Sequence, residues 1–94
     1  MDYFLTFDIG TTSVKTCVFD QNLRMLGHAN GEYLLLAARP GYVELEAETY
    51  VQAVLGGAKE AIARAGIDPK HIVSLSCTTQ GETLIPVGQA GEPL

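Results

Sequence analysis

The sequence is poor in basic residues and in long apolar runs. Lysine and arginine together number six among 94 residues and form no cluster, while aspartate and glutamate number eleven, so the formal net charge is −5. An acidic chain without a basic patch lacks the electrostatic features that attract nucleic acid or an anionic membrane, and we expect neither partner. No apolar run approaches the roughly 20 residues of a membrane-spanning helix. No secretory signal pattern follows Met1, so we expect a cytoplasmic protein.

Cysteine and histidine are also scarce. Cys17 and Cys77 are far apart in the sequence, as are His28 and His71, so neither the spacing of a zinc site nor a CxxC pair is present. We expect two buried, reduced thiols.

The length allows one domain at most. A chain this short buries only roughly 60–65% of the surface that its unfolded form exposes, and its stability is expected to be marginal without neighbours. No internal repeat or low-complexity segment is present. The last residues, Gly88 to Leu94, have the composition of a turn that leads further, so we expect a fragment of a longer protein.

Hydrophobic patterning predicts an α/β chain in the order strand, strand, strand, helix, strand, strand. The predicted strands cover Tyr3–Phe7, Val14–Phe19, Arg24–Leu36 with an interruption near Gly27–Gly31, Ile72–Cys77 as a buried strand, and Leu84–Val87. Gly10-Thr11-Thr12 joins the first two strands as a hairpin, and Asp20-Gln21-Asn22 has the composition of a turn.

One helix is predicted, from Glu48 to Ala65, and Gly66 stands where a helix-ending glycine is expected. Its apolar residues recur at three- and four-residue spacing: Val51, Val54, Leu55, Ala58, Ile62 and Ala65. Gly56 and Gly57 each cost the helix about 1 kcal/mol relative to alanine. Close packing against a sheet would explain them.

The segment from Asp8 to Lys15 combines groups that suit polyphosphate chemistry. Gly10 lets a phosphate approach the backbone, Thr11, Thr12 and Ser13 offer hydroxyl and N–H donors, and Lys15 adds a positive charge. Asp8 would repel phosphate unless a hydrated Mg²⁺ lay between them. The residues alone leave open an ordinary hairpin turn with solvated ends. GxxxxGK[ST] is absent, and a strand rather than a helix is predicted after the glycine, so neither a P-loop nor a dinucleotide-binding turn is present.

Asp8-Ile9-Gly10-Thr11-Thr12-Ser13-Val14-Lys15 resembles the first phosphate motif of the FGGY carbohydrate kinase family. Pro40-Gly41-Tyr42-Val43-Glu44 resembles the family's Pro-Gly-aromatic-x-Glu segment before its long helix, so the resemblance covers essentially the whole chain. It implies the N-terminal part of the first domain of a ribonuclease H-like, actin-like ATPase fold, with residues 1–94 as a partial domain. The family often has Asp-Pro at the helix entry, where this chain has Glu46-Ala47, a poorer N-cap by about 0.5–1 kcal/mol.

The resemblance also implies roles for residues. Asp8 would orient Mg²⁺–ATP through metal-bound water, Gly10, Thr11, Thr12 and Ser13 would line the phosphates, and Lys15 would contact them. The family's general base, an aspartate, its adenosine site and its second phosphate loop lie in later segments. No catalytic residue is therefore expected in this chain.

A second polar segment, Thr78 to Thr83, follows the strand predicted over Ile72–Cys77. The residues alone favour a solvated loop. The segment resembles the family's substrate loop, in which glutamine precedes two substrate-contacting residues, arginine and glutamate in glycerol kinases. Here Gln80 precedes Gly81 and Glu82, so we expect these three residues on the substrate side. The missing arginine argues against glycerol and leaves room for a larger sugar or sugar acid.

The resemblance implies ATP-dependent phosphorylation of a sugar, polyol or sugar acid hydroxyl, with the remainder of the kinase as partner. Two alternatives remain: a non-kinase actin-like ATPase, and a degenerate sugar-binding regulatory domain. The sequence leaves homo-oligomer formation open.

Purified residues 1–94 are expected to show no sugar-dependent ATP turnover, because the base and the adenosine site are expected elsewhere. A coupled assay for ADP release checks this, and measurable turnover that depends on added sugar would contradict it.

Overall fold

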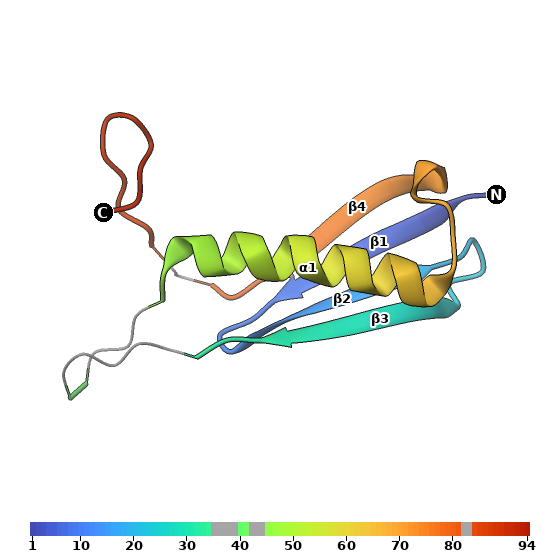
Figure 1. Cartoon of the computed structure of the whole chain (residues 1–94), viewed down its shortest axis with the longest axis horizontal. Coiled ribbons are helices and arrows are strands. Elements are labelled where there is room, and N and C mark those ends of the chain that lie inside the picture. The colour runs from blue at the N-terminus through green and yellow to red at the C-terminus, as the bar shows by residue number, and fades with distance from the viewer. Residues whose placement is uncertain (35–39, 42–44, 82–83) are drawn as a thin grey trace.

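The fold is a four-stranded sheet with one long helix packed on one face (Figure 1). The computed structural model describes residues 1–34, 40–41, 45–81 and 84–94. Its elements are β1 (Tyr3–Ile9), β2 (Ser13–Phe19), β3 (Met25–Glu32), α1 (Ala47–Ala65), the short 3₁₀ helix η1 (Pro69–His71) and β4 (Ile72–Thr79). The sheet order is β3-β2-β1-β4. The α/β class and the predicted order of the first five elements are confirmed.

Strand direction brings several chain segments to one end of the molecule. β1 and β2 are antiparallel, as are β2 and β3, whereas β1 and β4 are parallel. Parallel strands need a long crossover, and α1 supplies it. The carboxyl ends of β1 and β4 therefore lie at the same edge, together with the β1–β2 turn and the start of α1 (Figure 1).

Small residues allow α1 to lie close to the sheet. The fully buried helix residues are Gly57 and Ala61. A Cβ on Gly27 of β3 would lie 2.5 Å from the Ala61 carbonyl oxygen, and one on Gly57 would lie 2.5 Å from Thr16 Oγ1. The predicted close packing is confirmed for Gly57, whereas a Cβ on Gly56 would meet nothing within 4 Å.

The apolar face predicted for the helix is partly wrong. Ala58, Ile62 and Ala65 pack against the core, but the Val51 side chain is 47% exposed and that of Leu55 is 55% exposed. The predicted face was based on the spacing of the large apolar residues. The helix instead contacts the sheet through glycine and alanine, which rotates its buried face away from Val51 and Leu55.

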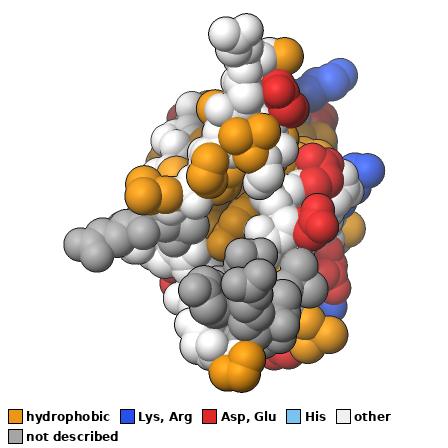
Figure 2. Space-filling model, turned by 90° about the vertical axis from the view of Figure 1, so that its left-hand side faces the viewer, with side chains coloured by type: hydrophobic (Ala, Val, Ile, Leu, Met, Phe, Trp, Pro, Cys, Tyr) orange, Lys and Arg blue, Asp and Glu red, His pale blue; other side chains and the backbone are white. Residues whose placement is uncertain are grey.

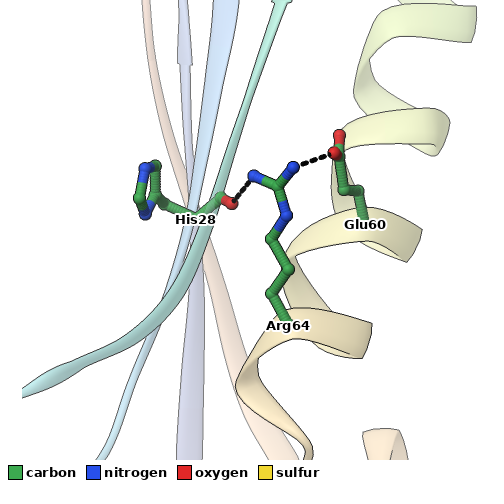
Figure 3. A network of polar contacts seen from close by, with 3 residues as sticks. All are labelled: His28, Glu60 and Arg64. Atoms are coloured by element: carbon green, nitrogen blue, oxygen red, sulfur yellow. Dashed lines mark hydrogen bonds and ion pairs between the residues drawn. The ribbon is translucent and has the colours of Figure 1, made fainter.

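The helix ends follow the expected chemistry. Glu46 at the N-cap makes no side-chain capping bond, and Gly66 ends the helix with a left-handed φ of 66°. Arg64 joins the last turn to β3, because its Nη1 donates to the His28 carbonyl oxygen at 3.0 Å while Nη2 pairs with Glu60 (Figure 3).

In the described part of the chain, no helix combines the length and hydrophobicity needed to cross a membrane.

Two strand predictions are wrong in detail. β3 runs from Met25 to Glu32 without the interruption predicted near Gly27–Gly31. The end of that prediction, residues 35–36, lies outside the described residues, as does part of the Pro40–Glu44 segment. Residues 84–86 form no strand, and Val87 makes only an isolated bridge to Pro93. The backbone of this segment forms hydrogen bonds within a local loop instead, in which the Gly88 N–H donates to the Glu92 carbonyl oxygen at 2.8 Å.

The burial predicted for the strand over Ile72–Cys77 is wrong. Val73 and Leu75 of β4 are 58% and 65% exposed, because β4 is an edge strand and α1 packs over β3 and β2. The prediction of buried thiols is also wrong. Cys77 is exposed, Cys17 is half-buried, and both are free.

The two adjacent helix glycines provide a matched test of the close contact. Gly57→Ala is expected to lower the free energy of unfolding by about 1–3 kcal/mol, because the new Cβ would overlap Thr16 Oγ1. Gly56→Ala, which meets open space, should raise it by about 1 kcal/mol through helix propensity. Urea unfolding of each variant measures the difference. Thr16→Ala should recover most of the loss in the Gly57→Ala background, and equal effects of the two glycine variants would contradict the close approach.

Candidate functional site

The predicted β1–β2 hairpin is confirmed and turns at Gly10 to Thr12. The Gly10 N–H donates to the Ser13 carbonyl oxygen at 2.8 Å. A Cβ on Gly10 would lie 3.3 Å from that same oxygen, tighter than most real contacts, so glycine suits this position. Thr11 and Thr12 are exposed, which leaves the tip of the turn open to a ligand.

Four polar residues form a row across the sheet. In the strand register, Asp8 is opposite Lys15, Lys15 is opposite Asn30, and Asp8 is beside Thr78. Residues paired in register point to the same face of a sheet. All four are exposed.

The row lies on the face opposite α1. Its neighbour in β2, Thr16, is fully buried and faces Gly57 of the helix. Because successive strand residues point to opposite faces, Lys15 and its row point away from α1. The structure thus brings together Asp8 and Lys15, as predicted. Both belong to the described residues and no ion pair joins them, so the ammonium is available to a ligand.

Tyr33, immediately after β3, contacts three carbonyl groups of the turn. Its N–H donates to Thr12 at 3.0 Å, and its hydroxyl donates to Gly10, with a longer contact of 3.4 Å to Ser13. In a planar trans peptide the N–H points opposite to the carbonyl. The carbonyls of Gly10 and Thr12 face Tyr33, and the N–H groups of Thr11 and Ser13 therefore point away from it.

These N–H groups are available as hydrogen-bond donors. Within the described residues, the N–H groups of Thr11 and Thr12 donate to no acceptor, and the Ser13 N–H does not close the turn onto the Gly10 carbonyl. Successive free N–H groups in a turn form a concave site for anions. Of the predicted phosphate-lining residues, Thr11 and Ser13 thus direct their N–H groups to the side away from Tyr33, whereas the Gly10 N–H is used within the turn, and the binding role of these residues stays a prediction.

A second tyrosine extends the contact to the other predicted segment. The rings of Tyr33 and Tyr50 meet edge to face, with centroids 5.5 Å apart and an interplanar angle of 79°. The Tyr50 hydroxyl accepts a hydrogen bond from Gln80 Nε2 at 3.0 Å. Burial raises the pKa of the Tyr33 phenol above its usual value of 10.0, and nearby Tyr50 raises it further. The phenol therefore remains a protonated donor at neutral pH.

The predicted substrate segment begins later than the sequence suggests. Thr78 and Thr79 are the last residues of β4, so the loop starts at Gln80. Gln80 is half-buried, and its N–H donates to the Ile9 carbonyl at 2.9 Å, which ties it to the end of β1. Gly81 is exposed, and Glu82 lies outside the described residues. Gln80 is thus beside the β1–β2 turn.

Two open depressions flank Tyr33, and the lining of each includes Glu32. One, of about 460 Å³, is lined by Thr12, Ser13, Glu32, Tyr33 and Leu34. The other, of about 570 Å³, includes Glu32, Glu46 and Glu48. Acidic side chains gather along one flank of this end of the molecule (Figure 2). Carboxylates repel phosphate but accept hydrogen bonds from hydroxyl groups, so the face with Lys15 suits phosphate better.

The donor set fits a magnesium–nucleotide more than a protein-caged metal. Among the described residues, no group of three or more histidine, cysteine, aspartate or glutamate side chains could hold a metal ion. Magnesium in phosphoryl-transfer sites is commonly held by one or two carboxylates, several waters and the phosphates themselves. Asp8, exposed beside the turn, is the residue predicted for this role, which stays a prediction.

Sequence reasoning missed Tyr33, Tyr50 and Asn30. Their roles depend on the register of β3 with β2 and on where α1 begins relative to the sheet. The hydroxyl of a partly buried tyrosine commonly has a hydrogen-bond partner, but the sequence does not indicate which residue that partner is.

Comparison with known proteins gives one consistent family. The model of the N-terminal domain of the FGGY family of carbohydrate kinases matches residues 3–94. Glycerol kinase 2 of Sulfolobus acidocaldarius is 39% identical over 83 residues, which are 88% of this chain and 17% of that protein.

Solved structures agree with this match. Gluconate kinase from Lactobacillus acidophilus superposes with a TM-score of 0.90 at 27% identity, over 99% of this chain and 18% of that one. Ligand-bound xylulose kinase from the same organism gives a TM-score of 0.91 at 26% identity, over 100% of this chain and 19% of that one. The chain thus spans less than a fifth of the length of these relatives.

Proposed function

The chain belongs to the FGGY family of carbohydrate kinases, and we propose that its protein transfers the γ-phosphoryl group of ATP to a hydroxyl of a sugar, polyol or sugar acid. Residues 1–94 would form part of the N-terminal domain and supply the first phosphate-binding hairpin and part of the substrate loop. One observation carries this proposal: the free N–H donors of Thr11 to Ser13, the Asp8–Lys15 row and Gln80 all lie at one edge of the sheet.

The phosphate side would work through positioning and charge. The N–H and hydroxyl groups of Thr11, Thr12 and Ser13 would bind phosphate oxygens, and Lys15 would offset their negative charge. Asp8 would bind water in the shell of a magnesium ion. That ion supplies charge neutralisation on the phosphates when it is bound.

The substrate side would orient the acceptor hydroxyl. The side-chain Nε2 of Gln80 donates a hydrogen bond to the Tyr50 hydroxyl, which leaves the side-chain oxygen Oε1 free to accept a hydrogen bond from a sugar hydroxyl. The acceptor oxygen then bonds to the γ-phosphorus as the bond to ADP breaks, and the hydroxyl proton passes to the aspartate base that the family has in a later segment.

The need for ATP is consistent with a cytoplasmic location, which stays a prediction.

The names of the relatives do not select one acceptor. They include glycerol, gluconate and xylulose kinases. Gly81 stands where the resemblance to glycerol kinases expects arginine, and it leaves space because a Cβ there would meet nothing within 4 Å of the described atoms. We favour an acceptor larger than glycerol, and a panel of polyols, pentoses and sugar acids tests this choice.

Lys15→Ala in the full-length kinase is expected to lower kcat/KM for ATP about ten- to a hundredfold, the effect of losing one charge-assisted hydrogen bond of about 1.5–3 kcal/mol. Lys59→Ala removes an equally exposed ammonium from α1 and is the matched control. Steady-state kinetics with varied ATP compare the two. If Lys15→Ala behaves like Lys59→Ala, Lys15 does not contact the phosphates.

Glu82→Gln is expected to raise KM for the acceptor severalfold, because a carboxylate that accepts from sugar hydroxyls becomes a neutral amide. KM for ATP should stay within twofold, which serves as an internal control. Unchanged acceptor kinetics would remove Glu82 from the substrate site.

A further inference from the structure

Two tyrosines connect the parts of the chain that carry the proposed phosphate and acceptor contacts. Tyr33 touches the carbonyl groups of the β1–β2 turn, and Tyr50, in the first turn of α1, touches Gln80. We infer that Tyr33 and Tyr50 are positioning residues, Tyr33 for the phosphate-binding N–H groups and Tyr50 for the acceptor-binding amide of Gln80. This inference rests on the proposed function and adds two residues to its site.

Tyr33 changes the hydrogen bonding of the β1–β2 turn. A two-residue hairpin turn ordinarily closes with bonds in both directions between its flanking residues. Here Gly10 donates to Ser13, but the Gly10 carbonyl accepts from the Tyr33 hydroxyl instead. No bond runs from the Ser13 N–H back to the Gly10 carbonyl, so this N–H is left out of the turn's own hydrogen bonding. The Tyr33 hydroxyl thus takes the place of the Ser13 N–H at the Gly10 carbonyl, and the Ser13 N–H stays available to a phosphate oxygen.

Tyr50 restricts the rotamer and orientation of Gln80. A glutamine side chain has three rotatable bonds, and fixing such a side chain costs up to about 1.5–2 kcal/mol. The bond from Gln80 Nε2 to Tyr50 and the bond from the Gln80 N–H to Ile9 hold both ends of the residue. With Nε2 engaged, the carbonyl oxygen is the group left for an acceptor hydroxyl.

The edge-to-face contact joins the two roles. The rings of Tyr33 and Tyr50 lie 5.5 Å apart, so a shift of either ring displaces the other. The turn after β1 and the residue after β4 are thereby held in a fixed relation by side chains from β3's end and from α1. Catalysis that depends on in-line geometry needs such a relation, since small misplacements of reacting groups cost large factors in rate.

The test deletes one hydroxyl at a time from the full-length kinase. Tyr33→Phe should raise KM for ATP about three- to tenfold, the effect of losing one neutral hydrogen bond, and leave KM for the acceptor within twofold. Tyr50→Phe should show the reverse pattern. Tyr3→Phe is the matched control, because its hydroxyl contacts Met1 at the opposite end of β1 and neither KM should change.

The outcomes separate this inference from the proposed function. If both phenylalanine variants match Tyr3→Phe, or change both KM values equally, the tyrosines do not position ligands and the inference is overturned. A variant that fails to melt cooperatively would show a folding contact and overturn it as well. Lys15→Ala, run alongside, tests the phosphate site itself. If Lys15→Ala impairs ATP use while Tyr33→Phe does not, the proposed function stands and this inference alone fails.

Discussion

The close approach of α1 to β2 and β3 determines where the helix meets the candidate site. Gly27 and Gly57 permit contacts that a single Cβ would block at 2.5 Å. With the helix this near, its first turn reaches the end of β3, and Tyr50 meets Tyr33. A helix held farther from the sheet by larger side chains would leave the two rings apart. The glycines weaken the isolated helix, yet they make the contact on which the arrangement of polar groups depends.

Parallel pairing supplies the second constraint. β1 and β4 are separated by more than sixty residues in the chain but run side by side. The residues that follow them, Gly10 and Gln80, therefore lie at the same edge. This is the general reason that ligands bind beyond the carboxyl ends of parallel strands. The antiparallel pairs β1–β2 and β2–β3 add the turn and Tyr33 to the same edge.

Local patterns gave much of the fold in advance. The hairpin, the helix with Gly66 at its end and the β4 strand were all predictable, because each depends on neighbouring residues. The site was predictable where one short segment holds its groups, as from Asp8 to Lys15. Long-range contacts were not predictable. The glycine at position 27 suggested a break in β3. It instead allows close packing against Ala61, and this contact could not be predicted because it involves a helix residue more than thirty positions away. Tyr33 and Asn30 required the strand register, and the exposure of Leu75 required knowing that α1 leaves β4 uncovered.

Exposure limits what this sheet can do by itself. Asp8 and Lys15 lie on a face that is open to water. Water weakens the interaction of charges: two unit charges 4 Å apart interact by only about 1 kcal/mol in bulk water, against about 4 kcal/mol where protein excludes part of the water. Phosphoryl transfer to a sugar also requires that water be kept from the γ-phosphate, which closure over a site achieves. Under the proposed function, the row therefore acquires its full strength only when further protein covers that face. The relatives, more than five times as long as this chain, have the length to provide such a cover. The 94 residues would then contribute a prearranged half of a site, in which the donors already point outward before the nucleotide arrives.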